Sequence, residues 1–151
     1  ILSQSLHIQG WRRCDQSPLP ISDPDSLTFQ QKNSYFILTQ QAYNDCLYLG
    51  DVAIAMAGTA TEQFIGLGKP AIAIPGNGPQ YNPGFAEAQS RLLGISLTLV
   101  NQPSQVLPAI QSLLKNPDIL HAIAENGIQR MGRAGAAQRI AECLQERVIG
   151  H

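Results

Sequence analysis

The chain has 151 residues, of which 44% are hydrophobic and 14% are charged, and its formal net charge is −1. This composition excludes an intrinsically disordered chain and suits one compact domain with a buried core. Because positive and negative charges nearly balance, no overall electrostatic field favours nucleic acid or an anionic membrane as a partner.

The cysteines and the apolar runs bear on where the protein works. Cys14, Cys46 and Cys143 are widely separated and form no pair with metal-ligand spacing. Reduced thiols in a cytoplasmic protein explain them best. No apolar run reaches the roughly 20 residues needed to cross a bilayer, so any membrane association is expected to be peripheral. We expect no metal site and no cofactor.

Segments with helix and strand patterns alternate along the chain. Helical spacing of Leu2 and Leu6 predicts a helix over residues 1–9, and three prolines mark 15–25 as a surface loop. Short apolar runs predict strands over residues 34–38, 51–56, 71–74 and 96–100. Helical spacing, or a proline in a first turn, predicts helices over residues 40–48, 61–67, 85–93, 103–114, 117–125 and 134–148. The alternation predicts an α/β fold, with a Rossmann-like parallel sheet and helices on both faces, formed by residues 1–151 as one domain.

The most informative segment, residues 55–76, reads as a strand, a tight glycine turn, a helix, a second glycine turn and a strand. At the first turn, Gly58 can adopt a positive φ angle and lets a ligand approach the backbone. The helix start adds about half a positive charge, which favours a phosphate. Thr59 or Thr61 can cap the helix or donate to phosphate, and a plain capped helix explains them about equally well. The candidate residues, the last two within reach of a ribose diol, are Gly58, Thr59, Ala60, Thr61, Glu62 and Gln63.

A second loop, residues 75–84 (PGNGPQYNPG), follows the predicted strand 71–74. In parallel α/β sheets ligands bind beyond the carboxyl ends of the strands, which is where both loops are expected. Gln80 and Asn82 each offer hydrogen-bond donors and acceptors to a sugar or a base. An ordinary connection is the alternative, but the length of the loop favours function. The candidate ligand-binding residues in it are Gly76, Asn77, Gly78, Gln80 and Asn82.

Other polar and aromatic residues give weaker indications of a functional site. Glu87 and Arg91 have the spacing of a surface ion pair, which we favour over a site. Trp11 and Tyr81 are expected in the core or at its rim rather than stacked on a base. None of the three histidines has an acid partner at a recognisable spacing, so no general base or other catalytic residue is assigned. Neither glycine turn is a Walker loop or GxGxxG, so generic motifs give no nucleotide specificity.

Five motifs carry a resemblance to a known family: AGTATEQ (57–63), GLGKP (66–70), PGNGPQYN (75–82), FAEAQSRLLG (85–94) and RMGRAGAAQRIAECL (130–144). From about Tyr35 onward the chain resembles the C-terminal half of a GT-B glycosyltransferase. The resemblance is to the lipid-A-disaccharide synthase type, in a cyanobacterial and plant branch. In this superfamily two Rossmann-like domains face each other across a cleft, and the C-terminal domain binds the nucleotide-sugar donor.

The resemblance implies metal-independent transfer of a hexose or hexosamine to a lipid-linked or membrane-associated acceptor. It implies that the turn 58–61 holds the diphosphate of a donor such as a UDP-sugar, and that Gln80 and Asn82 face the sugar. The catalytic base of such enzymes comes from an N-terminal domain. We therefore expect this chain to be a C-terminal fragment that binds the donor and does not catalyse transfer by itself.

One position departs from the family pattern. The ribose-binding carboxylate is expected at position 63, but that residue is Gln63 and the acid is Glu62. A shift of one residue turns a side chain by about 100° around a helix. Either Gln63 binds the diol as a neutral acceptor, or the donor lies differently. Two other readings stay open: half of a nucleotide-sugar 2-epimerase-like enzyme, or a non-catalytic binding or assembly module, and exposed interdomain surface would favour a homodimer.

Overall fold

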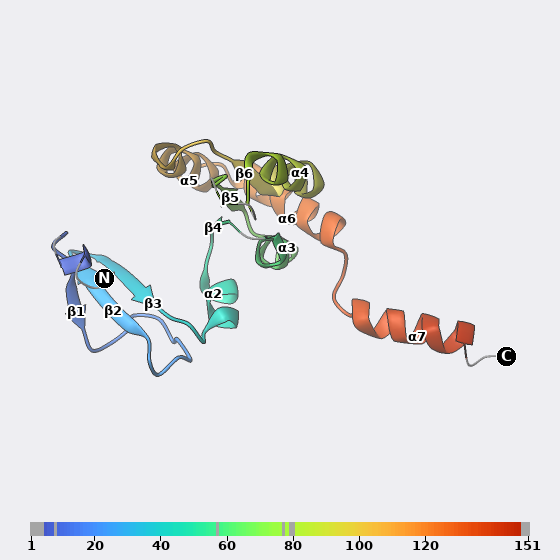
Figure 1. Ribbon diagram of the computed structural model, residues 1–151, viewed down its shortest axis with the longest axis horizontal. Coiled ribbons are helices and arrows are strands. Elements are labelled where there is room, and N and C mark those ends of the chain that lie inside the picture. The colour runs from blue at the N-terminus through green and yellow to red at the C-terminus, as the bar shows by residue number, and fades with distance from the viewer. Residues whose placement is uncertain (1–4, 8, 57, 77, 79–80, 149–151) are drawn as a thin grey trace. The chain divides into compact units, whose positions relative to one another are not determined.

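The computed structural model describes residues 5–7, 9–56, 58–76, 78 and 81–148. The chain, predicted as one domain, divides into two compact units, Ile1–Gly50 and Asp51–His151 (Figure 1). Each unit has a sheet of its own, and the two sheets differ in strand direction. The units are therefore described separately.

The first unit contains a three-stranded antiparallel sheet. Its strands are β1 (Arg12–Cys14), β2 (Leu27–Gln31) and β3 (Ser34–Leu38), in the order β1-β2-β3, and the helix α2 (Tyr43–Leu49) follows. The small core of this unit centres on Phe29, whose side chain is 1% exposed. The rings of Phe29 and His7 meet edge to face, with centroids 6.2 Å apart. The ring centroids of Trp11 and Phe36 lie 6.1 Å apart.

This antiparallel sheet corrects the sequence prediction for the first 50 residues. Residues 34–38 form the predicted strand, but they pair antiparallel with β2 instead of joining a parallel sheet. The strands β1 and β2 were not predicted, because RRC and LTFQQ are too polar to read as buried strands. The turn between β2 and β3 was also missed, because its left-handed position (φ +53°) is occupied by Lys32 rather than by a glycine.

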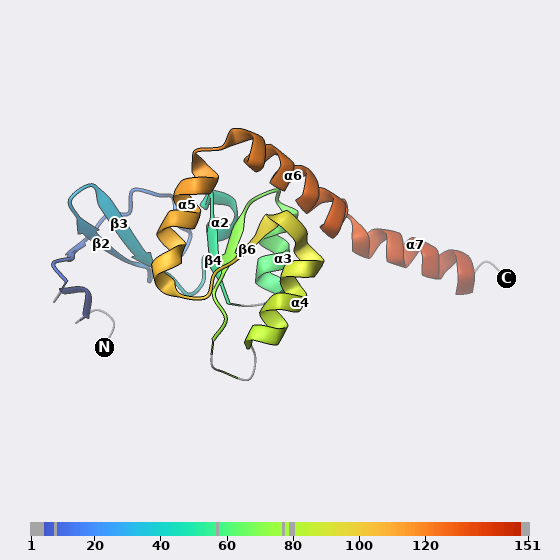
Figure 2. The ribbon, with the colours of Figure 1, turned by 90° about the horizontal axis from the view of Figure 1, so that it is seen from above.

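The second unit confirms the predicted α/β class. Its parallel sheet has the order β4-β5-β6, with strands β4 (Ala53–Ala55), β5 (Ala71–Ala73) and β6 (Leu97–Leu99). Figure 2 shows α5 on one side of this sheet and α3 and α4 on the other, an arrangement compatible with a Rossmann-like fold. The helices are α3 (Gly58–Gly66), α4 (Pro83–Leu93), α5 (Val106–Leu114), α6 (Pro117–Met131) and α7 (Ala136–Val148).

The core of the second unit lies on the α5 side of the sheet. Buried side chains of Ile72, Val100, Leu113 and Ile123 form one cluster, against which residues of α5 and α6 pack. The neighbours of Ile72 in β5, Ala71 and Ala73, are completely buried. Since successive strand residues point to opposite faces, these alanines lie on the α3 and α4 side, where their small size lets helices approach closely.

Helix α6 crosses α3 at a glycine. A Cβ atom at Gly127 would overlap the carbonyl oxygen of Ile65, so only glycine fits this crossing. The sequence predicted that α6 ends at Glu125, because glycine normally weakens a helix. The close approach of α3 explains why the helix instead passes through Gly127 to Met131.

The other element boundaries differ from the predictions by a few residues. Helix α3 starts at Gly58 rather than at Thr61, so Thr59 already lies in its first turn. Two glycines with positive φ, Gly132 (+78°) and Gly135 (+90°), separate α6 from α7. No helix among the described residues is long and apolar enough to cross a membrane.

Candidate functional site

The candidate site lies where the three parallel strands of the second unit end. Because the strands run in the same direction, their carboxyl ends meet at one edge of the sheet. Helix α3 begins at Gly58, just beyond β4, and a loop leads from the end of β5 to α4. The two segments approach each other, since a Cβ atom at Gly76 would lie 3.1 Å from Cε of Met56. The structure thus brings together the two glycine turns that the sequence singled out.

Gln89 of α4 connects the start of α3 to the loop that follows β5. Its Nε2 donates a hydrogen bond to the carbonyl oxygen of Gly58 (3.2 Å), and its Oε1 accepts one from the hydroxyl of Tyr81 (2.9 Å). The backbone N–H of Gly76 in turn donates to the carbonyl oxygen of Tyr81 (2.8 Å). Gln89 and Tyr81 are only 4% and 6% exposed. A buried hydrogen-bonded path therefore runs from Gly58 to Gly76.

Tyr81 and Phe85 form the aromatic part of this edge. Their ring centroids lie 5.5 Å apart. Burial raises the pKa of Tyr81, so its hydroxyl stays protonated and serves as a donor at neutral pH. Phe85 is 45% exposed and lies over Gly58, where an added Cβ atom would be 3.6 Å from Cζ of Phe85. An exposed ring thus stands beside the first turn of α3.

The candidate residues of α3 occupy different environments. Gly58 lies in the helix and outside the left-handed region, so its expected positive φ is not found; its lack of a side chain matters here. Thr59 and Gln63 are exposed, and Ala60 and Glu62 are half-buried. Thr61 is completely buried and packs inside the unit. Of the two threonines, only Thr59 therefore has a side chain that a ligand can reach.

The candidate residues of the second loop are described in part. Gly76 is half-buried and Gly78 is exposed, whereas Asn77 and Gln80 lie outside the described residues. Asn82 caps α4, where its Oδ1 accepts a hydrogen bond from the backbone N–H of Phe85 (2.9 Å). Its Oδ1 is thus committed to the helix, and its amide nitrogen is the part that can donate to a ligand.

Sequence reasoning missed the part that Gln89 plays. The buried face of α4 consists of Ala86, Gln89 and Leu93, and Gln89 is the polar residue of the three. A polar residue on an apolar helix face was the available indication. The neighbouring ion pair was predicted correctly: Arg91 and Glu87 lie 3.8 Å apart, and both side chains are exposed.

Among the described residues, no group of three or more His, Cys, Asp or Glu side chains gathers as a metal site would require. The candidate residues offer backbone amides, side-chain amides, a hydroxyl, a phenol and the carboxylate of Glu62. The amides and hydroxyls among them are donors that can bind and orient an anion.

The comparisons with known proteins identified no relative of this chain. No family model matches the chain, and searches of the curated proteins and of the solved structures found no match. The resemblance to GT-B glycosyltransferases therefore stays a prediction from the sequence motifs.

Proposed function

We propose that residues 51–151 bind the diphosphate of a nucleotide sugar at the carboxyl edge of the parallel sheet. In this proposal the unit is the donor-binding half of a metal-independent GT-B glycosyltransferase that transfers a hexose or hexosamine to a lipid-linked or membrane-associated acceptor. The observation that supports it most is the start of α3. This helix begins at Gly58 beyond β4, with Thr59 and Ala60 next, and buried Gln89 ties that start to the second loop.

The chemistry of a helix start suits a diphosphate. The first N–H groups of a helix have no partner within the helix, and they carry partial positive charge. The absence of a side chain at Gly58 and the small one at Ala60 let phosphate oxygens approach these amides. Preformed donors of this kind stabilise the charge of a leaving diphosphate without reorganisation. We assign donor binding to this chain, with the catalytic base supplied from outside it.

In this proposal the side chain of Glu62 or of Gln63 binds the ribose of the nucleotide. Glu62 is half-buried and Gln63 is exposed, and the two side chains project about 100° apart around α3. Replacing each by alanine separately identifies the contact. We expect the variant at the ribose-binding position to lose affinity for UDP and to keep its affinity for pyrophosphate, which has no ribose.

Calorimetric titration of the 151-residue chain with UDP and UDP-GlcNAc tests the proposal. The sharpest variant is Thr59→Asp, because an acid in the first turn stabilises a helix but repels a phosphate. We expect it to keep or raise the melting temperature and to lower UDP affinity by about tenfold or more. Ser104→Asp, at the short helix that leads into α5, adds the same charge at another helix start and serves as the control. No heat with either nucleotide at millimolar concentration would refute donor binding.

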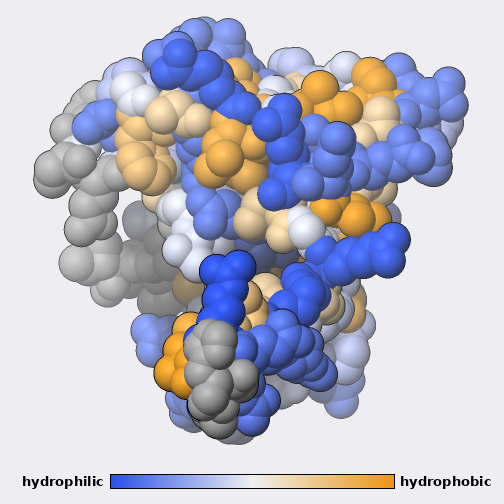
Figure 3. Space-filling model, turned by 90° about the vertical axis from the view of Figure 1, so that its right-hand side faces the viewer, coloured by the Kyte–Doolittle hydropathy of each residue, from blue (hydrophilic) through white to orange (hydrophobic). Residues whose placement is uncertain are grey.

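A second candidate function, an assembly module, is supported by α7. All 13 residues of this helix are exposed, and Ile140, Leu144 and Val148 recur every four residues with exposed fractions of 61%, 58% and 72%. Figure 3 shows one face of the surface, on which hydrophobic residues lie among hydrophilic ones. An uncovered apolar stripe of this kind is typical of a contact surface.

A further inference from the structure

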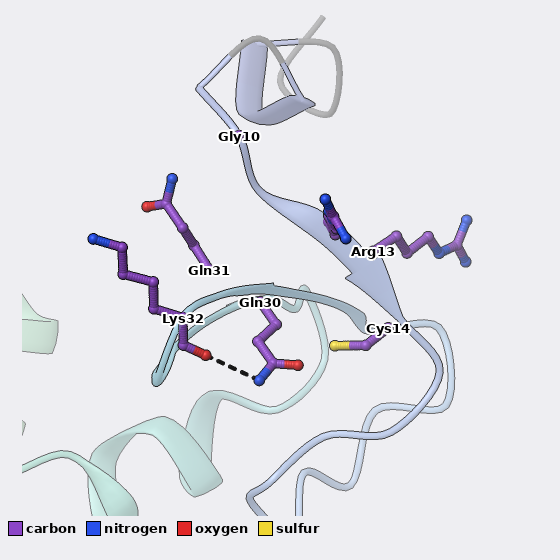
Figure 4. Close-up of a pocket in the computed structure, with 7 residues that line it drawn as sticks. Gly10, Arg13, Cys14, Gln30, Gln31 and Lys32 are labelled. Atoms are coloured by element: carbon purple, nitrogen blue, oxygen red, sulfur yellow. Dashed lines mark hydrogen bonds between the residues drawn. The ribbon is translucent and has the colours of Figure 1, made fainter.

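A cavity of about 520 Å³ lies beside the β1–β2 pair in the first unit (Figure 4). We call it the basic cavity; its lining residues are Gly10, Arg12, Arg13, Cys14, Gln30, Gln31 and Lys32. Figure 4 shows Cys14 and Gln30 pointing toward one another between the two strands, while Arg13 and Lys32 extend outward on opposite sides. The volume is in the range of pockets that hold small molecules.

Charges in the first unit are segregated around this cavity. Residues 1–50 contain three basic side chains, Arg12, Arg13 and Lys32, and all three line the basic cavity. The four aspartates of this segment do not line it. Two of them are engaged elsewhere, because Asp23 accepts from Thr39 and Asp45 accepts from the backbone N–H of Ser22. The basic cavity is thus lined by cations and by no carboxylate, while Asp15 and Arg13 together line an adjoining pocket.

The three cations also have no carboxylate partner within the described part of the chain. Ion pairs are found elsewhere, joining Arg91 to Glu87 and His121 to Glu125. Arg12 and Lys32 both line the cavity, and an anion placed between them is attracted by both charges. Arginine and lysine side chains are long and flexible enough to close over such an anion.

The backbone around the cavity is held in a fixed and partly strained form. Lys32 has a φ angle of +53°, a left-handed conformation that costs a non-glycine residue about 1 kcal/mol. The amide of Gln30 donates to the carbonyl oxygen of Lys32 (3.0 Å), and the amide of Gln31 donates to that of Gln9 (2.8 Å). A cation is thus retained at a turn position where glycine would fit better. Such strain is characteristic of functional positions.

From these observations we propose that the basic cavity is a binding site for a phosphate monoester. A phosphate monoester carries close to two negative charges at neutral pH, which matches the two cations Arg12 and Lys32 better than a single carboxylate does. The cavity is larger than a phosphate group, so an organic substituent fits with it. The phosphate belongs either to a soluble ester or to a lipid headgroup, and the experiment separates these sources. The inference does not depend on the proposed nucleotide-sugar site.

Fluorescence of Trp11 provides a local readout, because it is the only tryptophan and lies between the lining residues Gly10 and Arg12. In one arm the 151-residue chain is titrated with glycerol 3-phosphate. In the other it is titrated with phosphatidylcholine vesicles with and without phosphatidic acid. We expect a saturable change of Trp11 emission with the soluble ester, or with the phosphatidic acid vesicles alone. The responding arm identifies the source of the phosphate.

Two variants and a control decide whether the basic cavity is responsible. Lys32→Gly removes a cation and relieves the positive φ angle, so we expect a higher melting temperature together with about tenfold weaker binding or more. Arg12→Gln should weaken binding to a similar extent. Lys115→Gln removes the same charge at the end of α5 in the other unit and should leave the affinity unchanged.

Several results would overturn the proposal. One is the absence of any Trp11 response to glycerol 3-phosphate and to both kinds of vesicle at millimolar phosphate. Another is an equal loss of affinity in Lys115→Gln and Lys32→Gly, which would show a general effect of charge. A third is binding of single-stranded RNA that depends on Arg12 and Lys32 while neither phosphate probe binds.

Discussion

The side-chain amide of Gln89 donates a hydrogen bond to the carbonyl oxygen of Gly58 across 3.2 Å, and so joins α4 to the first residue of α3. The same side chain accepts a hydrogen bond from Tyr81. Because both partners belong to the candidate edge and Gln89 is only 4% exposed, its side chain supports the edge from inside the unit. Its replacement should therefore change both the stability of the fold and the affinity for a nucleotide.

We predict that Gln89→Leu lowers the free energy of unfolding by about 1–3 kcal/mol, because it leaves a buried hydroxyl and a carbonyl without this partner. Tyr81→Phe removes one of the two hydrogen bonds and should cost about 1 kcal/mol. Urea unfolding measures both values. UDP affinity should fall more in Gln89→Leu than in Tyr81→Phe, since only the former releases Gly58. Equal affinities in the two variants would argue against a positioning role.

The second prediction concerns pH and Asp23. Its buried carboxylate accepts hydrogen bonds from the hydroxyl of Thr39 (2.6 Å) and from the backbone N–H groups of Gln40 (2.9 Å), Gln41 (3.1 Å) and Asp25 (3.0 Å). These bonds, led by that from Thr39, lower its pKa from 3.8 to about 2. A lowered pKa in the folded state means that folding favours the ionised form. The stabilisation is present above pH 3.8 and is lost as the pH falls toward 2.

Thermal unfolding between pH 2 and pH 6 tests this assignment. Asp23→Asn should melt at a lower temperature than the wild type near pH 6, and the difference should shrink steadily below the ordinary pKa of an aspartate, about 3.9. Asp25→Asn is the matched control, because Asp25 takes part through its backbone N–H only. A difference that stays constant over the whole range would show that ionisation of Asp23 is not the cause.

The third prediction concerns the crossing of α3 and α6. Gly127→Ala places a methyl group on the carbonyl oxygen of Ile65, which cannot move without shifting α3. We expect a loss of about 3 kcal/mol or more in the free energy of unfolding, since overpacking against backbone is not relieved by a rotamer change. Gly78→Ala, where no atom lies within 4 Å of the added Cβ, should change stability by about 0.5 kcal/mol or less.

The fourth prediction concerns the exposed stripe of α7. If this stripe mediates self-association, the apparent mass in sedimentation equilibrium rises with protein concentration. Leu144→Glu should abolish the rise, because it places a charge within the apolar stripe. Gln145→Glu adds the same charge at the next residue, on the polar face of the helix, and should have little effect. A monomer at all concentrations for the wild type would reject the assembly module as a homodimer.

The parallel half of the fold was predictable because its local patterns are strong. The runs around Ala53–Ala55 and Ala71–Ala73 are short, apolar and bounded by turn residues, as buried strands are. The first-turn proline Pro117 gave the start of α6 correctly, and the helical spacing of residues 85–93 placed α4 to within two residues. Propensity and packing agree at these positions, so the sequence alone was sufficient.

The antiparallel sheet and the bridge through Gln89 were not predictable for a different reason. Strand β2 carries polar residues, and its turn uses a lysine where a hairpin normally has glycine, so local patterns point away from the structure. Gln89 acquires its role from Gly58, which is 31 residues away in the sequence. Contacts over such separations are set by tertiary packing, which no window of sequence contains.

The crossing at Gly127 joins two helices that are far apart in the sequence. During synthesis α3 is therefore complete before the residues of α6 that pack against Ile65 have been translated. Until then α3 has β4, β5 and α4 as neighbours but lacks the helix that packs against its C-terminal end. We therefore expect the C-terminal end of α3 to reach its final form late, and amide hydrogen exchange of residues 63–66 to slow only when α6 docks.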